Sequence, residues 1–442
     1  MIQYVFAHNW SRLKRRTLIA QLMHIAMVAG EYPPRWGGIG SVVFHLAGHL
    51  ASFGHHVTVI TRSHEGRAPA QSGVTVVEVP WLKLPMTFTR SYAKNALKVM
   101  KRLHQQEPFD VIHILLPLAS FTAKEFQFME QNIAPVCCSL NGSWLGEKEG
   151  ILRAAKAGES AIWLNPNDLA IRLTAKWYSR YEKAGLLNTS ISVAISESTL
   201  DEFAQWYAPN MQYNAKVMLW GCDHKVFRPA NIDDEEEQLQ HELIRQQYDC
   251  GDEKALSHDA STDTPMLLAV GRLVARKGYM TLLRAMPEIL TKHPGAKLVI
   301  IGRGHMKRKL LKVAKKLSIS DSVFINSGMS FDDLAQHFRS ADLVIYPSYY
   351  EGQGLIPLES MSSGTPIVTV DMPPLTEMVD TSVGRLFEMG NSVDLAKTVN
   401  DLLDDSSARV SMASKGRELV LSKYTYEQNA NDFIEIYQSI VS

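Results

Sequence analysis

The strongest chemical signal in this sequence is a glycine-rich loop with a glutamate on each side, Glu351 and Glu359. Gly352 and Gly354 let backbone N–H groups approach a ligand closely because glycine has no Cβ. Leu355, a further candidate for donor binding, leads from this loop into a predicted helix, whose N-terminus can bind an anion. The two carboxylates would repel a phosphate, but they suit hydrogen bonds from sugar or ribose hydroxyls. Alternatively, Glu351 is a turn residue and Glu359 complements the helix dipole.

A second candidate is the basic loop after the predicted strand 266–270. Arg272 offers a planar fork of donors and Lys277 a compact positive charge, a combination that could clamp a diphosphate. The alternative is a solvated basic loop without a ligand. Arg276, which lies between the two, is given no role.

A third candidate is the loop after the first predicted strand. The amides of Gly37 and Gly38 open a helix there and could contact phosphates from the opposite wall of a site. Gly38 and Gly40 also begin a dinucleotide-binding fingerprint, but its third position is Val43. The following strand ends at Arg62, without the acidic residue that would bind an NAD ribose. We therefore expect no nicotinamide cofactor.

Short apolar runs alternate with amphipathic segments in both halves of the chain, a pattern typical of parallel α/β sheets. Predicted strands cover residues 24–28, 57–60, 74–79, 111–115, 266–270, 297–301, 323–325, 343–346 and 367–370. Predicted helices of the second half cover 280–290, 306–317, 331–338 and a short segment from 356. We expect an α/β fold of two facing Rossmann-like doubly wound domains, with ligands bound between them at the carboxyl ends of the strands.

The predicted divisions of the chain are an N-terminal extension (1–22), an N-terminal domain (23–230), an acidic and polar linker or insertion (231–264), a C-terminal domain (265–420) and a docking helix (421–442). A capping box at Thr425 and Gln428, followed by an apolar stripe, predicts the docking helix. The extension superficially resembles a secretory signal, but polar Gln21 and His24 interrupt its apolar run. We expect no cleavage, and Met23 is an alternative start.

The ordered motifs of the second half resemble the retaining glycosyltransferases of family 4, which have the GT-B fold. The matching stretches are Tyr346-Pro-Ser, Glu351-Gly-x-Gly, Glu359-Ser-Met and Gly364-Thr-Pro-Ile-Val. The resemblance implies that Arg272 and Lys277 stabilise the leaving diphosphate of a nucleotide-sugar donor. Glu351 would orient the sugar and Glu359 would bind the ribose.

The resemblance also implies a hydroxyl acceptor, which is a glycan, a lipid-linked molecule or a small molecule, bound by the N-terminal domain. No metal or other cofactor is expected, and the sequence has no DxD triplet that would place a divalent ion on the diphosphate. One position departs from the family pattern. Members commonly carry His-Gly where this chain has Asn141-Gly142, and an asparagine cannot become a cation.

Composition limits the partners and the compartment. Lys plus Arg and Asp plus Glu are 46 each, so no net charge favours nucleic acid. The four cysteines show no metal-binding spacing, so we expect free buried thiols in a cytoplasmic protein. Residues 145–187 are rich in Lys, Arg and Trp. They fit either peripheral contact with the inner membrane face or an ordinary helix covering the sheet.

The sequence is also compatible with three other functions. A GT-B epimerase would share the fold, and a sugar phosphorylase would use inorganic phosphate in place of a nucleotide. A non-catalytic sugar-nucleotide sensor would bind a donor without turnover, and the asparagine at position 141 is the feature that keeps this alternative open.

Overall fold

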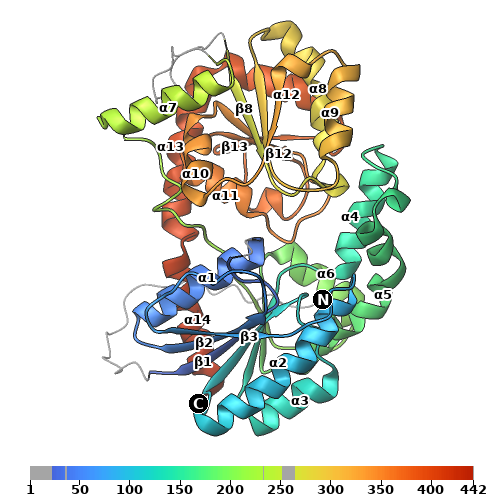
Figure 1. Ribbon diagram of the computed structural model, residues 1–442, viewed down its shortest axis with the longest axis vertical. Coiled ribbons are helices and arrows are strands. Elements are labelled where there is room, and N and C mark those ends of the chain that lie inside the picture. The colour runs from blue at the N-terminus through green and yellow to red at the C-terminus, as the bar shows by residue number, and fades with distance from the viewer. Residues whose placement is uncertain (1–21, 35–36, 232, 251–263, 442) are drawn as a thin grey trace, which may run out of the picture.

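The computed structural model describes residues 22–34, 37–231, 233–250 and 264–441. These residues form two lobes stacked along the long axis of the molecule (Figure 1). Each lobe has one parallel sheet, with strand orders β3-β2-β1-β4-β5-β6-β7 and β10-β9-β8-β11-β12-β13. The predicted fold class, two doubly wound α/β domains, is confirmed. The predicted extension lies outside the described residues, except for Leu22.

The N-terminal lobe contains strands β1 to β7 and helices α1 to α6. Its strands are β1 (His24–Ala29), β2 (His56–Arg62), β3 (Val74–Val79), β4 (Val111–Leu116), β5 (Val136–Leu140), β6 (Ile191–Ala194) and β7 (Ala215–Val217). Its helices are α1 (Gly38–Ser52), α2 (Thr87–Gln106), α3 (Ala123–Asn132), α4 (Trp144–Lys156), α5 (Pro166–Leu187) and α6 (Glu197–Tyr207), with the 3₁₀ turn η1 (Ile162–Leu164).

The C-terminal lobe contains β8 to β13 and most of the remaining helices. Its strands are β8 (Met266–Val270), β9 (Lys297–Ile301), β10 (Val323–Asn326), β11 (Leu343–Tyr346), β12 (Ile367–Val370) and β13 (Gly384–Phe387). The helices are α7 (Glu235–Gln247), α8 (Tyr279–Lys292), α9 (Lys307–Lys316), α10 (Phe331–Ser340), α11 (Leu355–Ser362), α12 (Ser392–Asp404), α13 (Ser406–Lys423) and α14 (Tyr426–Val441). The 3₁₀ turns are η2 (Ala275–Lys277), η3 (Ser320–Ser322) and η4 (Leu375–Glu377).

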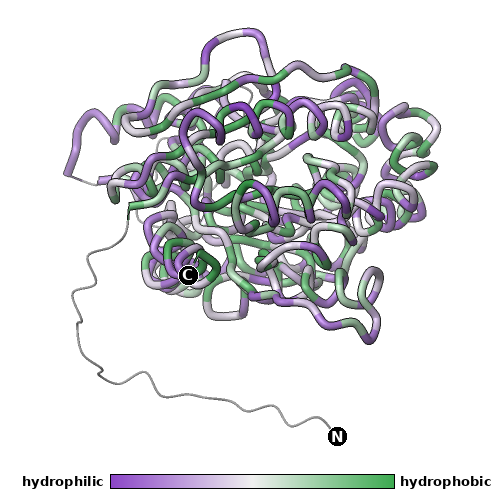
Figure 2. Tube along the Cα trace, turned by 90° about the horizontal axis from the view of Figure 1, so that it is seen from below, coloured by the Kyte–Doolittle hydropathy of each residue, from purple (hydrophilic) through white to green (hydrophobic). Residues whose placement is uncertain are grey.

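Every predicted strand is present and begins within one residue of its expected start. The predicted helices of the second half are α8 to α11. The predicted strand ranges leave out β5, β6, β7 and β13. Strands β6, β7 and β13 are short and interrupted by polar residues. Strands buried on both faces read as continuous apolar runs. Figure 2 shows this contrast in hydropathy: the inner segments are more hydrophobic, and the coiled segments around them alternate between hydrophilic and hydrophobic residues.

The last helix crosses from the C-terminal lobe to the N-terminal one. The amide of Gln428 donates to Thr425 Oγ1 at 3.2 Å, and the amide of Thr425 donates to Gln428 Oε1 at 3.1 Å, so the capping box is confirmed. From this cap α14 runs along α1 in the N-terminal lobe (Figure 1). Ala430, Phe433 and Tyr437 of its apolar stripe are fully buried there. The end of the chain therefore fastens the two lobes together.

Part of the segment expected to be a solvated linker or insertion is a helix, which corrects the expectation that the segment is solvated throughout. Helix α7 begins after Asp234, whose carboxylate accepts hydrogen bonds from the amides of Glu236 and Glu237. Arg245 forms a buried ion pair with Asp342 at 3.0 Å. The acidic run is thus the start of a helix, because carboxylates are favourable at a helix N-terminus. Residues 251–263 of the segment lie outside the described part of the chain.

Buried polar side chains of the N-terminal sheet have structural roles. Cys137 and Cys138 belong to hydrophobic clusters on opposite faces of β5, and all four cysteines are free and buried, as predicted. His113 is fully buried, with Nδ1 2.7 Å from Tyr437 Oη and Nε2 2.7 Å from Ser139 Oγ. Burial lowers the pKa of His113 to about 3, so this histidine belongs to the core. Among the helices described, none is both long and apolar enough to cross a bilayer.

Candidate active site

The candidate residues lie where the strand order of each sheet reverses. In the C-terminal sheet this point is between β8 and β11, and in the N-terminal sheet between β1 and β4. Loops that leave neighbouring strands in opposite directions open a crevice at such a point, and ligands of doubly wound sheets bind there. The loops of Lys277 and Glu351 follow β8 and β11, and the loop of Gly37 and Gly38 follows β1.

Lys277 and Glu351 meet across the C-terminal switch point. The Lys277 ammonium donates to Glu351 Oε1 at 2.5 Å and to Tyr346 Oη at 2.6 Å. Ser348 Oγ donates to the same carboxylate oxygen at 2.6 Å. An ammonium has three donors. Among the described residues Lys277 uses two of them, which leaves one for a ligand.

Arg276, to which no role was given, is part of this site. Its guanidinium lies 3.5 Å from Glu351 Oε1, donates to Glu147 Oε1 at 2.6 Å and donates to the carbonyl of Tyr350 at 3.1 Å. The sequence held a signal for it, since it stands directly beside Lys277 in the same basic loop. Position in that loop could not show which cation turns inward.

The charged groups shift one another's proton affinity. Burial alone would raise the pKa of Glu351, but Lys277 and Arg276 outweigh this effect and hold that pKa well below its usual range. Burial lowers the pKa of Lys277, while the attraction of Glu351 opposes the shift. Glu351 is therefore an ionised carboxylate at neutral pH, held in a fixed position by cations.

Glu359 is in a different environment on α11. Its carboxyl is buried, and Oε2 has no hydrogen-bond partner among the described residues. Burial without a nearby cation raises the pKa of Glu359 to about 7. A buried acceptor without a partner costs roughly 1–3 kcal/mol. This oxygen keeps the capacity to accept a hydrogen bond, which a ligand hydroxyl could supply.

The glycine loop connects this pair to the opposite lobe. Gly354 has a φ of +95°, which favours glycine, and it is the N-cap of α11. Leu355 therefore begins the helix, one residue before the predicted start at 356. A Cβ built on Gly38 would lie 4.0 Å from a methyl group of Leu355. A Cβ on Gly352 would lie 2.8 Å from the carbonyl oxygen of Asn141. The N-termini of α1 and α11 therefore lie on facing walls.

The start of α1 carries a feature that the sequence did not reveal. The Glu31 carboxylate lies 2.5 Å from the position of a Cβ on Gly37, and Oε2 accepts a hydrogen bond from the amide of Gly40 at 3.4 Å. A carboxylate at a helix N-terminus has the same electrostatic preference as a phosphate. A side chain larger than the hydrogen of Gly37 would collide with it.

Arg272 and Asn141 differ in how firmly they are held. Arg272 is exposed, and its guanidinium makes no hydrogen bond or ion pair to any described residue. Asn141 is fully engaged: its Nδ2 donates to the Leu116 carbonyl at 3.1 Å and its Oδ1 accepts from Trp220 Nε1 at 2.7 Å. The side-chain amide of Asn141 is thus held within the N-terminal lobe, and its role in catalysis stays a prediction.

Tyr350, the neighbour of Glu351, inserts into the opposite lobe. A Cβ on Gly146 would lie 2.3 Å from the hydroxyl of Tyr350, and a Cβ on Gly150 would lie 2.4 Å from its Cβ. The hydroxyl accepts from the amide of Ser143 at 3.0 Å and donates to Glu202 at 3.2 Å. Glycines at every fourth position leave a flat helix face. We call the surface of α4 that receives Tyr350 the tyrosine socket. The spacing of its glycines is visible in the sequence, although the socket was not predicted.

Two carboxylates, buried Glu159 and partly exposed Glu377, cap helices of the opposite lobe. Glu159, after α4, accepts hydrogen bonds from the amides of Met280 and Thr281 at the start of α8, at 2.9 and 2.8 Å. In the reverse direction Glu377 accepts from the amides of Glu197 and Ser198 at the start of α6, both at 2.9 Å. These reciprocal caps hold the carboxyl ends of both sheets face to face.

The tyrosine socket predicts that one substitution changes the free energy of unfolding in opposite directions in two backgrounds. Gly146→Ala should lower the free energy of unfolding, because overpacking costs about 1–3 kcal/mol whereas alanine improves helix propensity by about 1 kcal/mol. In a Tyr350→Ala background the clash is gone, and Gly146→Ala should stabilise the protein. Urea denaturation of the four proteins measures both effects. An equal effect of Gly146→Ala in the two backgrounds would show that Tyr350 does not fill the socket.

Comparisons with known proteins match both lobes. Residues 252–419 match the family model described as glycosyl transferases group 1, and residues 36–212 match the one described as glycosyltransferase family 4. An uncharacterized glycosyltransferase of Methanocaldococcus jannaschii is 28% identical over 423 residues, covering 94% of this chain and 98% of the relative. A GDP-mannose-dependent α-(1-6)-phosphatidylinositol monomannoside mannosyltransferase of Mycobacterium tuberculosis is 26% identical over 418 residues, covering 92% and 96%.

Among solved structures, the sucrose-phosphate synthase of Thermosynechococcus elongatus superposes with a TM-score of 0.72 at 20% identity, covering 94% of this chain and 98% of that one. This likeness concerns the fold, and it extends over both lobes. With each half matched by its own family model and the whole chain matched by relatives of similar length, the chain belongs to the family 4 glycosyltransferases with the GT-B fold.

Proposed function

We propose that the protein is a retaining hexosyltransferase, which moves a sugar from a nucleotide-diphosphate donor to a hydroxyl acceptor. The observation that carries this proposal is the pair of unlike carboxylates in the cleft. Glu351 is ionised between Lys277 and Arg276, whereas Glu359 is buried without a cation and has an unpartnered oxygen. One carboxylate is suited to hold a sugar in place and the other to accept hydrogen bonds from ribose hydroxyls.

The donor diphosphate would lie between the two helix N-termini that face each other across the cleft. Amides near Gly37, Gly38 and Gly354 would contact it from both walls, and Arg272 and Lys277 would supply the positive charge. As the bond to the anomeric carbon breaks, negative charge grows on the diphosphate. Preorganised donors aimed at such charge contribute roughly 3–4 kcal/mol each in a site without water.

The acceptor hydroxyl would attack the anomeric carbon on the face that the diphosphate leaves, so that the configuration is retained. A phosphate oxygen of the donor would take the acceptor's proton, because Glu351 is tied to cations and has a low proton affinity. Protein cations would replace a metal on the diphosphate. The reciprocal caps favour a closed arrangement of the lobes, which would limit hydrolysis of the donor.

The acceptor side belongs to the N-terminal lobe, and one surface there suggests a location for the protein. On α5, Leu173 and Trp177 are 71% and 49% exposed, and the Arg180 guanidinium stacks on Trp177 at 3.7 Å. Exposed Lys176 adds positive charge to this face. Exposed aromatic and basic side chains on one helix fit the surface of an anionic bilayer. We propose a cytoplasmic protein with peripheral contact to the inner membrane face.

Donor binding is the first test. Titration of the protein with UDP-, GDP- and ADP-sugars should raise its melting temperature with one nucleotide, and calorimetry should give the matching Kd. Lys277→Ala and Glu359→Ala should lose the effect, because they remove the diphosphate and ribose contacts. Arg308→Ala, a change of an exposed cation on α9, serves as control and should bind as the wild type does.

The outcomes separate the alternatives. If no nucleotide sugar binds to the folded wild type, the transferase proposal fails, and phosphate-dependent release of a sugar phosphate would indicate a phosphorylase. Interconversion of free nucleotide sugars would indicate an epimerase. Donor binding without turnover on any acceptor class, whether glycan, lipid-linked or small molecule, would indicate a sensor.

The pH dependence of donor binding provides a second test. Burial raises the pKa of Glu359 to about 7, so the carboxylate form is present above this pH and is lost as the pH falls through it. If the ribose requires the carboxylate, the Kd should rise roughly eightfold between about pH 7.5 and pH 6. Glu359→Gln should bind more weakly and show no such change. The same pH dependence in wild type and variant would assign the titration to another group.

Membrane contact can be tested by sedimentation with vesicles of phosphatidylglycerol and phosphatidylcholine. Reversal of charge at Lys176 and Arg180 together should weaken binding at least tenfold, because each basic residue near an anionic surface contributes about 1 kcal/mol. The same reversal at Lys315 and Lys316 on α9 is the matched control and should have little effect. If both double variants bind like the wild type, α5 is not the contact surface.

A further inference from the structure

Two histidines and a glutamate form a cluster at the amino-terminal ends of the N-terminal strands. The candidate active site lies at the opposite, carboxyl-terminal ends of these strands. His24 begins β1 and His56 begins β2, and the two residues pair in register. Residues in register on neighbouring parallel strands point to the same face of a sheet. The two imidazoles accordingly stack, with centroids 4.2 Å apart and planes 6° from parallel. Glu107 reaches them from the end of α2.

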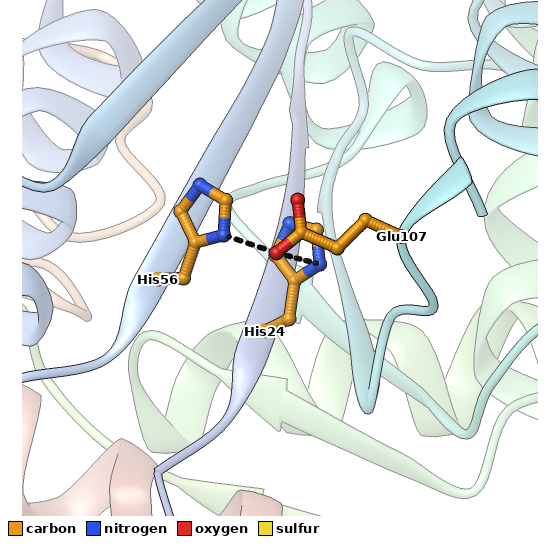
Figure 3. Close-up of side chains that lie close together, drawn as sticks. All are labelled: His24, His56 and Glu107. Carbon is orange, nitrogen blue, oxygen red and sulfur yellow. Dashed lines mark hydrogen bonds and ion pairs between the residues drawn. The ribbon is translucent and has the colours of Figure 1, made fainter.

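Both histidines direct the same ring nitrogen toward one carboxylate oxygen (Figure 3). Nδ1 of His56 lies 3.0 Å from Glu107 Oε1, and Nδ1 of His24 lies 3.8 Å from it. In the part of the chain that the structure describes, no other three His, Cys, Asp or Glu side chains bring ligand atoms this close together. The mechanism proposed above uses none of the three residues.

We propose that His24, His56 and Glu107 bind a zinc ion. Two imidazole nitrogens with one carboxylate oxygen form a donor set that zinc prefers, whereas magnesium and calcium favour oxygen ligands alone. Bonds of about 2.0 Å in a tetrahedral site place the ligand atoms roughly 3.3 Å apart. The two separations from Glu107 Oε1, 3.0 and 3.8 Å, lie on either side of this value.

The surroundings of His24 suit a metal ligand. Its other ring nitrogen, Nε2, lies 2.9 Å from Thr58 Oγ1, which can accept an N–H and thereby leave the lone pair of Nδ1 for the ion. Histidine ligands usually have such an outer partner. As it stands, Nδ1 of His24 donates to the carbonyl oxygen of Pro108 at 3.1 Å. Zinc would displace the proton of this hydrogen bond, and the carbonyl oxygen is then placed to become a further ligand. The parallel rings must each turn about χ2 so that both lone pairs meet at one ion.

The location indicates what bound zinc would do. The side chains of His56 and Glu107 are 40% and 62% exposed, so an ion can reach them from solvent. The ion would join the starts of β1 and β2 to the end of α2. It would therefore stabilise the N-terminal lobe without contacting the donor cleft, which lies at the other ends of these strands.

Calorimetric titration of the full chain with zinc chloride tests the proposal. We expect one equivalent to bind and the melting temperature to rise by roughly 5 °C once free zinc reaches a hundred times its Kd. Magnesium chloride should produce neither effect. His56→Gln and Glu107→Gln should each weaken zinc binding at least tenfold. Both side chains are partly exposed, and Glu107→Gln alone decides the question if His56→Gln does not fold.

His305→Gln is the matched control, because it removes an exposed histidine elsewhere on the molecule. It should bind zinc as the wild type does. Cobalt chloride gives an independent spectroscopic test, since a bound cobalt ion with these ligands absorbs visible light and the band should vanish in Glu107→Gln. Absence of a one-equivalent zinc event in the wild type would overturn the proposal. So would zinc binding of equal strength in the Glu107 and His305 variants.

Discussion

The burial of charge between the two lobes is the constraint on which the rest of the site depends. The side chain of Glu351 is only 10% exposed, and an unpaired carboxylate there would be strongly unfavourable. Lys277 and Arg276 compensate for this, and both come from the single loop after β8. That loop can meet Glu351 because β8 and β11 are neighbours at the point where the strand order reverses. Sheet topology and electrostatics thus fix the same position.

The site also depends on contacts between the lobes. Tyr350 fills the glycine face of α4, directly beside Glu351 in the chain. Glu159 and Glu377 cap helices of the opposite lobe. Helix α14 follows the C-terminal lobe in sequence but packs on α1 of the N-terminal lobe. Each contact satisfies polar groups or buries apolar surface that would otherwise face water. The facing walls are consequently held by helix ends and aromatic packing, while the loops between them carry the candidate site residues.

The two glutamates of the cleft show how environment separates groups of one type. Glu351 is held ionised by cations, whereas burial alone acts on Glu359 and raises its pKa to about 7. Such a difference would allow one carboxylate to orient a ligand while the other accepts hydrogen bonds from it. The same reasoning applies to the histidines. His113 is locked in the core between Tyr437 and Ser139, but His24 and His56 share a partly exposed carboxylate.

The sequence by itself determined the doubly wound fold, the strand positions and the loops that reach the cleft, because these follow from local periodicity, glycine placement and the order of the motifs. Only the tertiary structure decided which side chains meet. It turned Arg276 toward Glu351, engaged Asn141 with Trp220, and folded α7 from an acidic segment. It also brought His56 to Glu107, 51 residues away in the chain. Contacts of this kind depend on strand register and on the packing of distant helices, which no local pattern encodes.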